Sequence, residues 1–182
     1  MLQEFAEQVE KTAKAVVRDI HTALPGKIVS FAPETCTASV RPSGKFVTAD
    51  GAALEYPLIT DVPMTYPFSE GADAGTVFPI KSGDSCLIIV SEVELDQWRT
   101  GAESDAPLRF DLTSAMAVPA LMSAGRAAIR KAVEENAVVV KAQGAEIVVS
   151  DGEVSIVADV AIRGNVTVNG DLTTSGGVVR LN

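Results

Sequence analysis

The residues that could take part in catalysis are few and far apart in the sequence. His21 is the only histidine, so any Ser–His–Asp arrangement would depend on it alone. Glu92 with Glu94, and Glu134 with Glu135, are carboxylate pairs that could act as general acid and base. Glu92 and Glu94 are two residues apart, as on one face of a strand, and we place them at an exposed strand end. We therefore interpret them as solvated surface residues and not as a catalytic pair. We therefore expect no catalytic residues and no enzyme activity.

No nucleotide-binding pattern is present either. The GADAG stretch at 71–75 is not followed by Lys with Ser or Thr, and Asp73 would repel a phosphate, so we predict a turn and no cofactor. Cys36 and Cys86 cannot form a metal cluster alone. Both lie in apolar, strand-like runs, which favours buried free thiols over a disulfide.

Composition indicates a folded protein with a strand-rich core. Hydrophobic residues make up 47% of the 182 residues and aromatic residues only 5%, so the core is built from Val, Ile, Leu and Ala. The net charge of -9 would repel phosphates, and we expect no nucleic-acid partner. The charged N-terminus lacks a signal peptide, and no stretch is long and apolar enough to span a membrane, which predicts assembly in the cytoplasm.

Residues 1–24 are predicted to form an amphipathic helix. Apolar residues recur every three or four positions, and Pro25 with Gly26 is expected to end the helix. Packing on its own domain and association with a second copy or another partner are equally compatible with this pattern, so the role of the helix stays open. The apolar positions are Leu2, Phe5, Val9, Ala13, Val16, Val17 and Ile20.

Residues 25–101 are predicted to form a small five-stranded barrel of the oligonucleotide/oligosaccharide-binding (OB) type. Barrels of this type often bind single-stranded nucleic acid, but residues 25–100 hold ten acidic against five basic residues, which favours docking to protein. Residues 102–136 are expected to be a connector with a short helix. The expected strands are 26–31, 35–40, 55–62, 75–80 and 84–90.

Residues 137–182 show the clearest pattern in the sequence. Apolar or small residues occupy every even position from 154 to 172, whereas most odd positions are polar. Ordinary strands run about five or six residues, so an unbroken alternation over about twenty residues is unusual for a globular sheet. The even positions that we predict to form a common core are Val154, Ile156, Ala158, Val160, Ile162, Val166, Val168 and Leu172.

A ribbon of this length cannot bury its own apolar face, and the rest of the chain offers little to cover it. Three copies around an axis would direct the even residues inward and pair the open strand edges, so we predict an intertwined homotrimeric β-helix. Segments 137–142 and 145–150 are expected to begin the same stack. A single-chain solenoid, as in hexapeptide acyltransferases or bactofilin-like filaments, is the alternative.

The order of helix, barrel, connector and alternating β tail resembles the central spike and baseplate-assembly proteins of contractile-tail bacteriophages, including Mu-like phages and tailocins. RFDLTSAMAVPAL (109–121) is similar to the linker after their barrel, and GNVTVNGDLTTSGG (164–177) is similar to their β-helix repeats. The resemblance covers nearly the whole chain. It implies a structural virion protein of the tail baseplate in a contractile injection system.

In that family the barrel docks on the tail hub, and the trimeric spike pierces the host outer membrane when the sheath contracts. Some members end in a His-x-His apex that binds iron, but the sole histidine here lies at the opposite end, so we predict no metal. The chain ends at GGVVRLN. Either the needle is short and blunt, or a separate small tip protein caps it.

A second hypothesis is an acidic OB-like module that binds carbohydrate or protein, carried on a β-solenoid in a bactofilin-like or receptor-binding structural protein. It requires a concave aromatic patch on the barrel. The candidates for that patch are Tyr56, Tyr66, Phe68 and Trp98.

Overall fold

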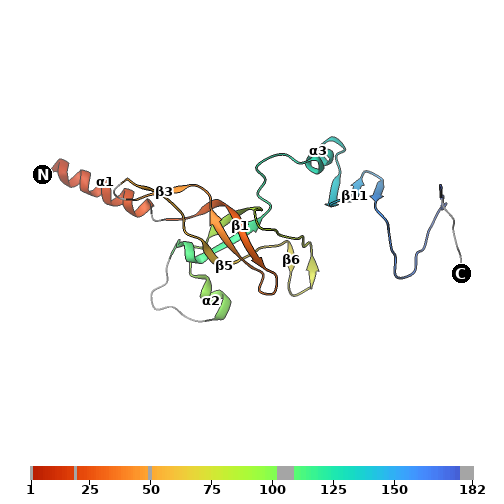
Figure 1. The fold of residues 1–182 in the computed structure, drawn as a ribbon, viewed down its shortest axis with the longest axis horizontal. Helices are drawn as coiled ribbons and strands as arrows, with labels where there is room; N and C mark the ends of the chain where they lie inside the picture. The colour runs from red at the N-terminus through yellow and green to blue at the C-terminus, as the bar shows by residue number, and fades with distance from the viewer. Residues whose placement is uncertain (1, 19, 49–50, 102–108, 177–182) are drawn as a thin grey trace. The chain divides into compact units, whose positions relative to one another are not determined.

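The computed structural model describes residues 2–18, 20–48, 51–101 and 109–176. The chain divides into two compact units, Met1–Ala124 and Gly125–Asn182. The first unit contains two α-helices, a 3-10 helix and most of the strands (Figure 1). Its elements are α1 (Leu2–Arg18), β1 (Ala23–Ala32), β2 (Thr37–Pro42), β3 (Lys45–Val47), β4 (Ala53–Glu55), β5 (Ile59–Pro63), β6 (Phe68–Ser69), β7 (Ala74–Gly75), β8 (Ser85–Val90), α2 (Leu95–Thr100), the 3-10 helix η1 (Leu112–Ser114) and β9 (Ala115–Pro119).

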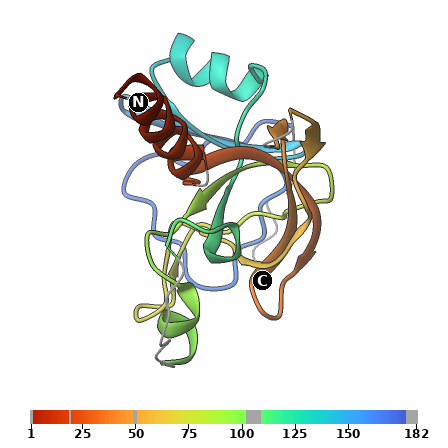
Figure 2. The ribbon, with the colours of Figure 1, turned by 90° about the vertical axis from the view of Figure 1, so that its left-hand side faces the viewer.

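Five strands of the first unit form an antiparallel sheet in the order β5-β2-β1-β8-β9. The sheet curls, as Figure 2 shows, and its two edge strands approach each other. Met64, next to β5, forms a parallel bridge with Ala117 of β9, and the Thr65 amide donates to the Ala117 carbonyl at 2.9 Å. The prediction of a mainly β protein with an N-terminal helix and a five-stranded, barrel-like sheet is confirmed in this form, as a half-barrel.

Alternating side chains from these strands fill the inside of the curl. In β8, every second residue is buried, as a strand with one face on the core requires. Gly26 of β1 packs against β8 without room for a side chain, because a Cβ there would be 2.5 Å from Cδ1 of Ile88. The fully or nearly buried core residues are Ile28, Ala38, Val40, Ile59, Val62, Met64, Cys86, Ile88, Ala115 and Ala117.

The fifth strand of the sheet is not the one that the sequence predicts. Residues 76–80 are not a strand, since Pro79 has no amide hydrogen to donate to a ladder. Instead β9, within the segment expected to be a connector, completes the sheet. Its two inward positions are Ala115 and Ala117, and such small residues give a weak apolar alternation.

The N-terminal helix is confirmed, but its predicted end is wrong. α1 ends at Arg18, and Pro25 and Gly26 lie inside β1, where they pair with Leu87 and Cys86 of β8. The large apolar side chains of Phe5, Val9, Val16 and Val17 in α1 are exposed in the single chain.

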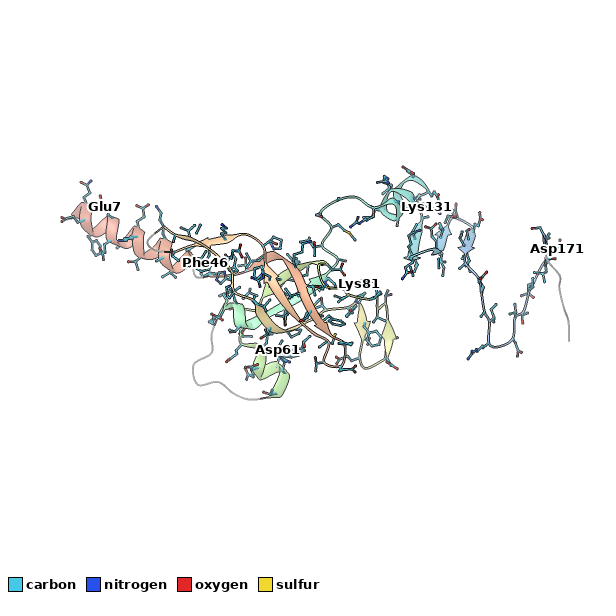
Figure 3. The ribbon with its side chains drawn as sticks, viewed as in Figure 1. Glu7, Phe46, Asp61, Lys81, Lys131 and Asp171 are labelled. Carbon is cyan, nitrogen blue, oxygen red and sulfur yellow. The ribbon has the colours of Figure 1, made fainter. Side chains whose placement is uncertain are left out.

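The second unit contains α3 (Ala127–Glu134) and an antiparallel sheet of β10 (Val138–Ala142), β11 (Ala145–Ser150) and β12 (Glu153–Val157). Turns at 143–144 and 151–152 join the strands, as the sequence predicts. Residues 158–176 carry no strand and are exposed, as Figure 3 illustrates around Asp171. Within the described part of residues 137–176, a β-helix is therefore not present in the single chain, and its formation by several copies stays a prediction. The C-terminal GGVVRLN from residue 177 onward lies outside the described residues.

Candidate functional site: two apolar surfaces

One face of the β10–β12 sheet is a regular array of apolar side chains, which we call the apolar β face. The antiparallel register sets Val140 opposite Ile147, and Ile147 opposite Ile156. Because alternate residues of a strand share a face, a second row lies beside the first. The array consists of Val138, Val149 and Val154 in one row, Val140, Ile147 and Ile156 in the next, and Ala142 with Ala145 at its end. All six large side chains of the array are exposed.

The opposite face of the same sheet packs beneath α3. Val148 is buried there, and Lys131 of α3 forms an ion pair with Glu146 of β11. Lys141 of β10 reaches the other oxygen of the same carboxylate at 3.0 Å. Hydrogen bonds from Lys131 and Lys141 lower the pKa of Glu146. The sheet thus has one face packed within its own chain and one that is apolar and uncovered.

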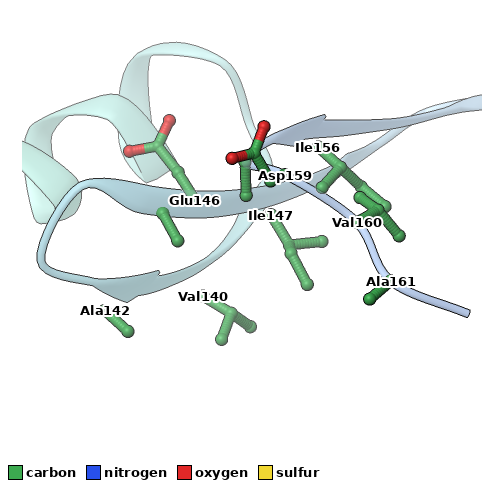
Figure 4. Close-up of a pocket in the computed structure, with 10 residues that line it drawn as sticks. Val140, Ala142, Glu146, Ile147, Ile156, Asp159, Val160 and Ala161 are labelled. Atoms are coloured by element: carbon green, nitrogen blue, oxygen red, sulfur yellow. The ribbon is translucent and has the colours of Figure 1, made fainter.

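The apolar β face continues beyond the last strand as a groove of about 310 Å³. Val140, Ile147 and Ile156 extend into it, together with Val160, while the carboxylate of Glu146 points away (Figure 4). Ile156, Ala158 and Val160, three of the residues predicted for the common core, therefore come together here.

The remaining predicted core residues do not meet in the single chain. Val154 lies on the same face within β12, one row from the groove. Ile162, Val166, Val168 and Leu172 lie in the strandless segment and are exposed. Val140 and Ile147 belong to the face but are absent from the predicted core. Both lie in runs of consecutive apolar residues, AVVVKA and AEIVVS, without a clean two-residue period, and the strand register is what places them on this face.

The second surface is an aromatic groove on the first unit, with a volume of about 720 Å³. The loop after β5, the β6–β7 hairpin, the β1–β2 turn and α2 bring its lining together. Trp98 of α2 is 74% exposed at this groove. The lining residues are Phe31, Pro33, Cys36, Met64, Thr65, Tyr66, Phe68, Glu70, Val77 and Trp98.

Most of the polar groups that line the aromatic groove already have partners. The Tyr66 hydroxyl donates to the Phe78 carbonyl at 3.2 Å, and the Thr65 hydroxyl donates to the Ala117 carbonyl at 3.4 Å. Burial, and then the nearby Cys36 thiol, raises the pKa of Tyr66. Glu70 is the charged residue in the lining. A ligand would therefore be held mainly by apolar and stacking contacts.

The structure brings together three of the four predicted aromatic residues, Tyr66, Phe68 and Trp98. Tyr56 lies elsewhere, with its ring 5.4 Å from Phe46 and 5.9 Å from His21. The prediction that Cys36 is buried in a strand is wrong. It is exposed in the turn between β1 and β2, whereas Cys86 is buried in β8 as expected, and both thiols are free.

Glu92, one of the candidate carboxylates, forms an ion pair with Arg109. In the described part of the chain, no cluster of three or more His, Cys, Asp or Glu side chains could hold a metal ion.

Residues 24–120 match the family model of the phage protein Gp138 N-terminal domain, and the match spans just over half of the chain. The chain belongs to this family. The matched range includes all five strands of the half-barrel sheet and the aromatic groove, whereas the apolar β face lies beyond it. A comparison with curated proteins finds no match.

Membership of the Gp138 N-terminal domain family makes this a phage protein and supports the expected class, a structural component of the virion. Among the described residues, no helix is long and apolar enough to cross a membrane. The Gp138 family match carries no information on the second unit, so the role of the apolar β face has to be argued from its own residues.

Proposed function

We propose that this protein is the homotrimeric central spike of a contractile tail baseplate. In this role the half-barrel docks on proteins of the tail hub, and the second unit forms a β-helix with two further copies. The spike contacts the host outer membrane transiently when the sheath contracts. The function is mechanical, with no enzyme activity and no cofactor.

The observation that carries this proposal is the uncovered apolar β face and its continuation in the even-numbered residues up to Leu172. Val140, Ile147 and Ile156 lie side by side with their side chains exposed. Contiguous apolar patches of this kind mark interaction sites. A threefold axis supports the burial of all three faces against one another, because each copy presents the same surface at the same height.

The same geometry explains why the segment 158–176 has no strand in one chain. A strand needs hydrogen-bonding neighbours, and β12 is the edge of its sheet. In the proposed trimer the neighbours come from other copies, so the strand forms only on assembly. Unfolding then requires all three chains to separate, and this gives the high kinetic barrier that a piercing device needs.

The proposal is tested in two steps. Light scattering of the purified full chain should give the mass of three copies, whereas a mass of 19.0 kDa would contradict it. Immunogold labelling of purified tails should then place the protein at the end distal to the capsid. Labelling of the capsid or the tail fibres would exclude the spike role.

A second candidate function is supported by the aromatic groove alone, namely capture of an apolar protein segment by the half-barrel. The groove has few free polar groups, which disfavours carbohydrate because sugars need several hydrogen-bond partners. Trp98→Ala should weaken binding of purified hub proteins about tenfold or more, as loss of a central aromatic contact does. Tyr56→Ala, which removes an aromatic residue outside the groove, is the matched control.

A further inference from the structure

The apolar residues of the N-terminal helix repeat at an interval of eleven. The four apolar positions of the first eleven residues of this segment are each followed, eleven residues later, by another apolar residue. Apart from Ala15, the positions between them are polar. Three repeated pairs lie within α1, namely Leu2 with Ala13, Phe5 with Val16, and Ala6 with Val17, and a fourth joins Val9 to Ile20, which lies beyond the end of α1 at Arg18.

The described side chains of this apolar seam are uncovered in the single chain, whereas polar residues of α1 interact within the helix. Val9 is 51% exposed and Val16 is 58% exposed. Lys14 pairs with Glu10 at 2.5 Å, and the Thr12 hydroxyl donates to the Gln8 carbonyl at 2.9 Å. The helix therefore has an uncovered apolar face and a polar face that already contains a salt bridge.

An interval of eleven residues suits packing against other helices. It corresponds to 3.67 residues per turn, slightly more than the 3.6 of a straight helix, and it keeps a seam facing partner helices in a right-handed supercoil. Contact with a globular surface does not require such a repeat. In addition, most of the stability of a helix in a protein comes from packing of its apolar face, so we expect α1 to have a partner.

We propose that α1 packs against the α1 helices of two further copies, in a parallel, in-register bundle. This inference rests on the proposed trimer, because a threefold axis brings identical residues of three chains to the same height. The Glu10–Lys14 salt bridge is formed within each helix, which reduces repulsion between like charges of adjacent copies. The assembly would then be held together at both ends of the chain.

A thiol at position 9 tests the bundle in the full chain. Val9→Cys is made in a Cys36→Ser background, which removes the exposed native thiol and leaves the buried Cys86. In the bundle, three thiols surround the axis, but only two can join. Oxidation should therefore link at most about two-thirds of the chains as dimers on a non-reducing gel. Gln8→Cys in the same background, on the polar face, should not crosslink.

Light scattering of the same samples separates this inference from the proposed function. A trimeric mass, with crosslinking at position 9 limited to about two-thirds of the chains, supports both. A trimeric mass without that crosslink overturns the helix bundle and leaves the spike trimer standing. A monomeric mass overturns both, and crosslinking of nearly all chains indicates a helix pair and rejects the bundle.

A last variant tests whether α1 is covered by the aromatic groove instead of by other α1 helices. Val9→Cys with native Cys36 retained reports on the aromatic groove, because Cys36 lines it. Crosslinks between position 9 and Cys36 would place α1 in the groove of a neighbouring half-barrel and overturn the bundle. If the bundle is correct, restoring Cys36 leaves the crosslinking pattern unchanged.

Discussion

Ile147 of β11 and Ile156 of β12 lie directly opposite each other across the sheet, yet their side chains are 39% and 48% exposed. A cross-strand pair of large aliphatic residues normally stabilises a sheet by burial against a further layer. The layer that α3 provides is on the opposite face. Much of the apolar surface of this pair can therefore stabilise the sheet only if another molecule covers it.

The alternation in the strandless segment predicts different outcomes for neighbouring residues. Val166→Asp places three carboxylates near the proposed axis, where burying an unpaired charge costs several kcal/mol, about 3 or more per site. Loss of the trimeric mass in light scattering is expected. Thr167→Asp, at the adjacent odd position, should leave the mass unchanged. Equal effects of the two substitutions would contradict an alternating inner face.

The contact between Gly26 and Ile88 predicts a compensating pair of mutations in the half-barrel. Gly26→Ala places a methyl group 2.5 Å from Cδ1 of Ile88, and overpacking of this kind costs about 1–3 kcal/mol. Ile88→Val removes the Cδ1 atom and alone costs about 0.5–1.5 kcal/mol. In denaturant titrations, the free energy of unfolding of the double variant should fall by less than the sum of the two single losses. Strict additivity would show that the contact is not a constraint.

Asp111 predicts a specific pH dependence of stability. Its carboxylate accepts bonds from the Thr113 hydroxyl at 2.6 Å and the Thr113 amide at 2.9 Å, and the side-chain bond, then the backbone bond, lowers the pKa of Asp111. A lowered folded-state pKa stabilises the fold above the unfolded value of about 3.9. This contribution is lost as the pH falls through the folded-state pKa.

Asp111→Ala should therefore lower the free energy of unfolding by about 1 kcal/mol at pH 7, as loss of an N-cap does. The difference from the wild type should shrink in acid, when denaturant titrations are repeated at decreasing pH. Asp111→Asn keeps an acceptor without a titrating group and should retain more stability at pH 7. A constant difference between Asp111→Ala and wild type at all pH values would rule out the ionised cap.

The two cysteines should differ in their reactivity with a thiol reagent. Cys36 is exposed, whereas Cys86 is fully buried and burial raises the pKa of its thiol, which reduces the reactive thiolate. At pH 8, Cys36 should react more than about tenfold faster than Cys86, which becomes accessible only on opening of the sheet. Cys36→Ser should remove the fast phase. A fast phase that persists in this variant would contradict the burial of Cys86.

Strong periodicity made part of the fold predictable. The helix, four of the five sheet strands, and the turns at Gln143 and Asp151 follow from apolar spacing and turn residues. Apolar alternation does not reveal β9, because alanines occupy its inward positions, and it favours the Pro79 segment instead. Pro25 and Gly26 resemble a helix stop locally, but their pairing with β8 is a long-range contact that local propensity does not encode.

The candidate surfaces were predictable to different degrees. The two-residue period identified the β12 part of the apolar β face, Val154 and Ile156, but not its β10 and β11 parts. It also gives no information on which copies cover the face, because identical strands in one chain or three produce the same pattern. The aromatic groove depends on α2 and the β6–β7 hairpin lying beside the end of β5. Such proximity is set by the curl of the sheet, so the sequence suggested the aromatic residues without their arrangement.

The position of β12 at the edge of its sheet has a consequence for newly synthesised chains. Its outer backbone groups can pair with any extended segment that arrives first, including the wrong part of another copy. Formation of the correct trimer therefore competes with edge-to-edge association of many chains, and a high local concentration of nascent chains favours that association. Slow expression at low temperature should accordingly raise the yield of correctly closed particles over inclusion bodies.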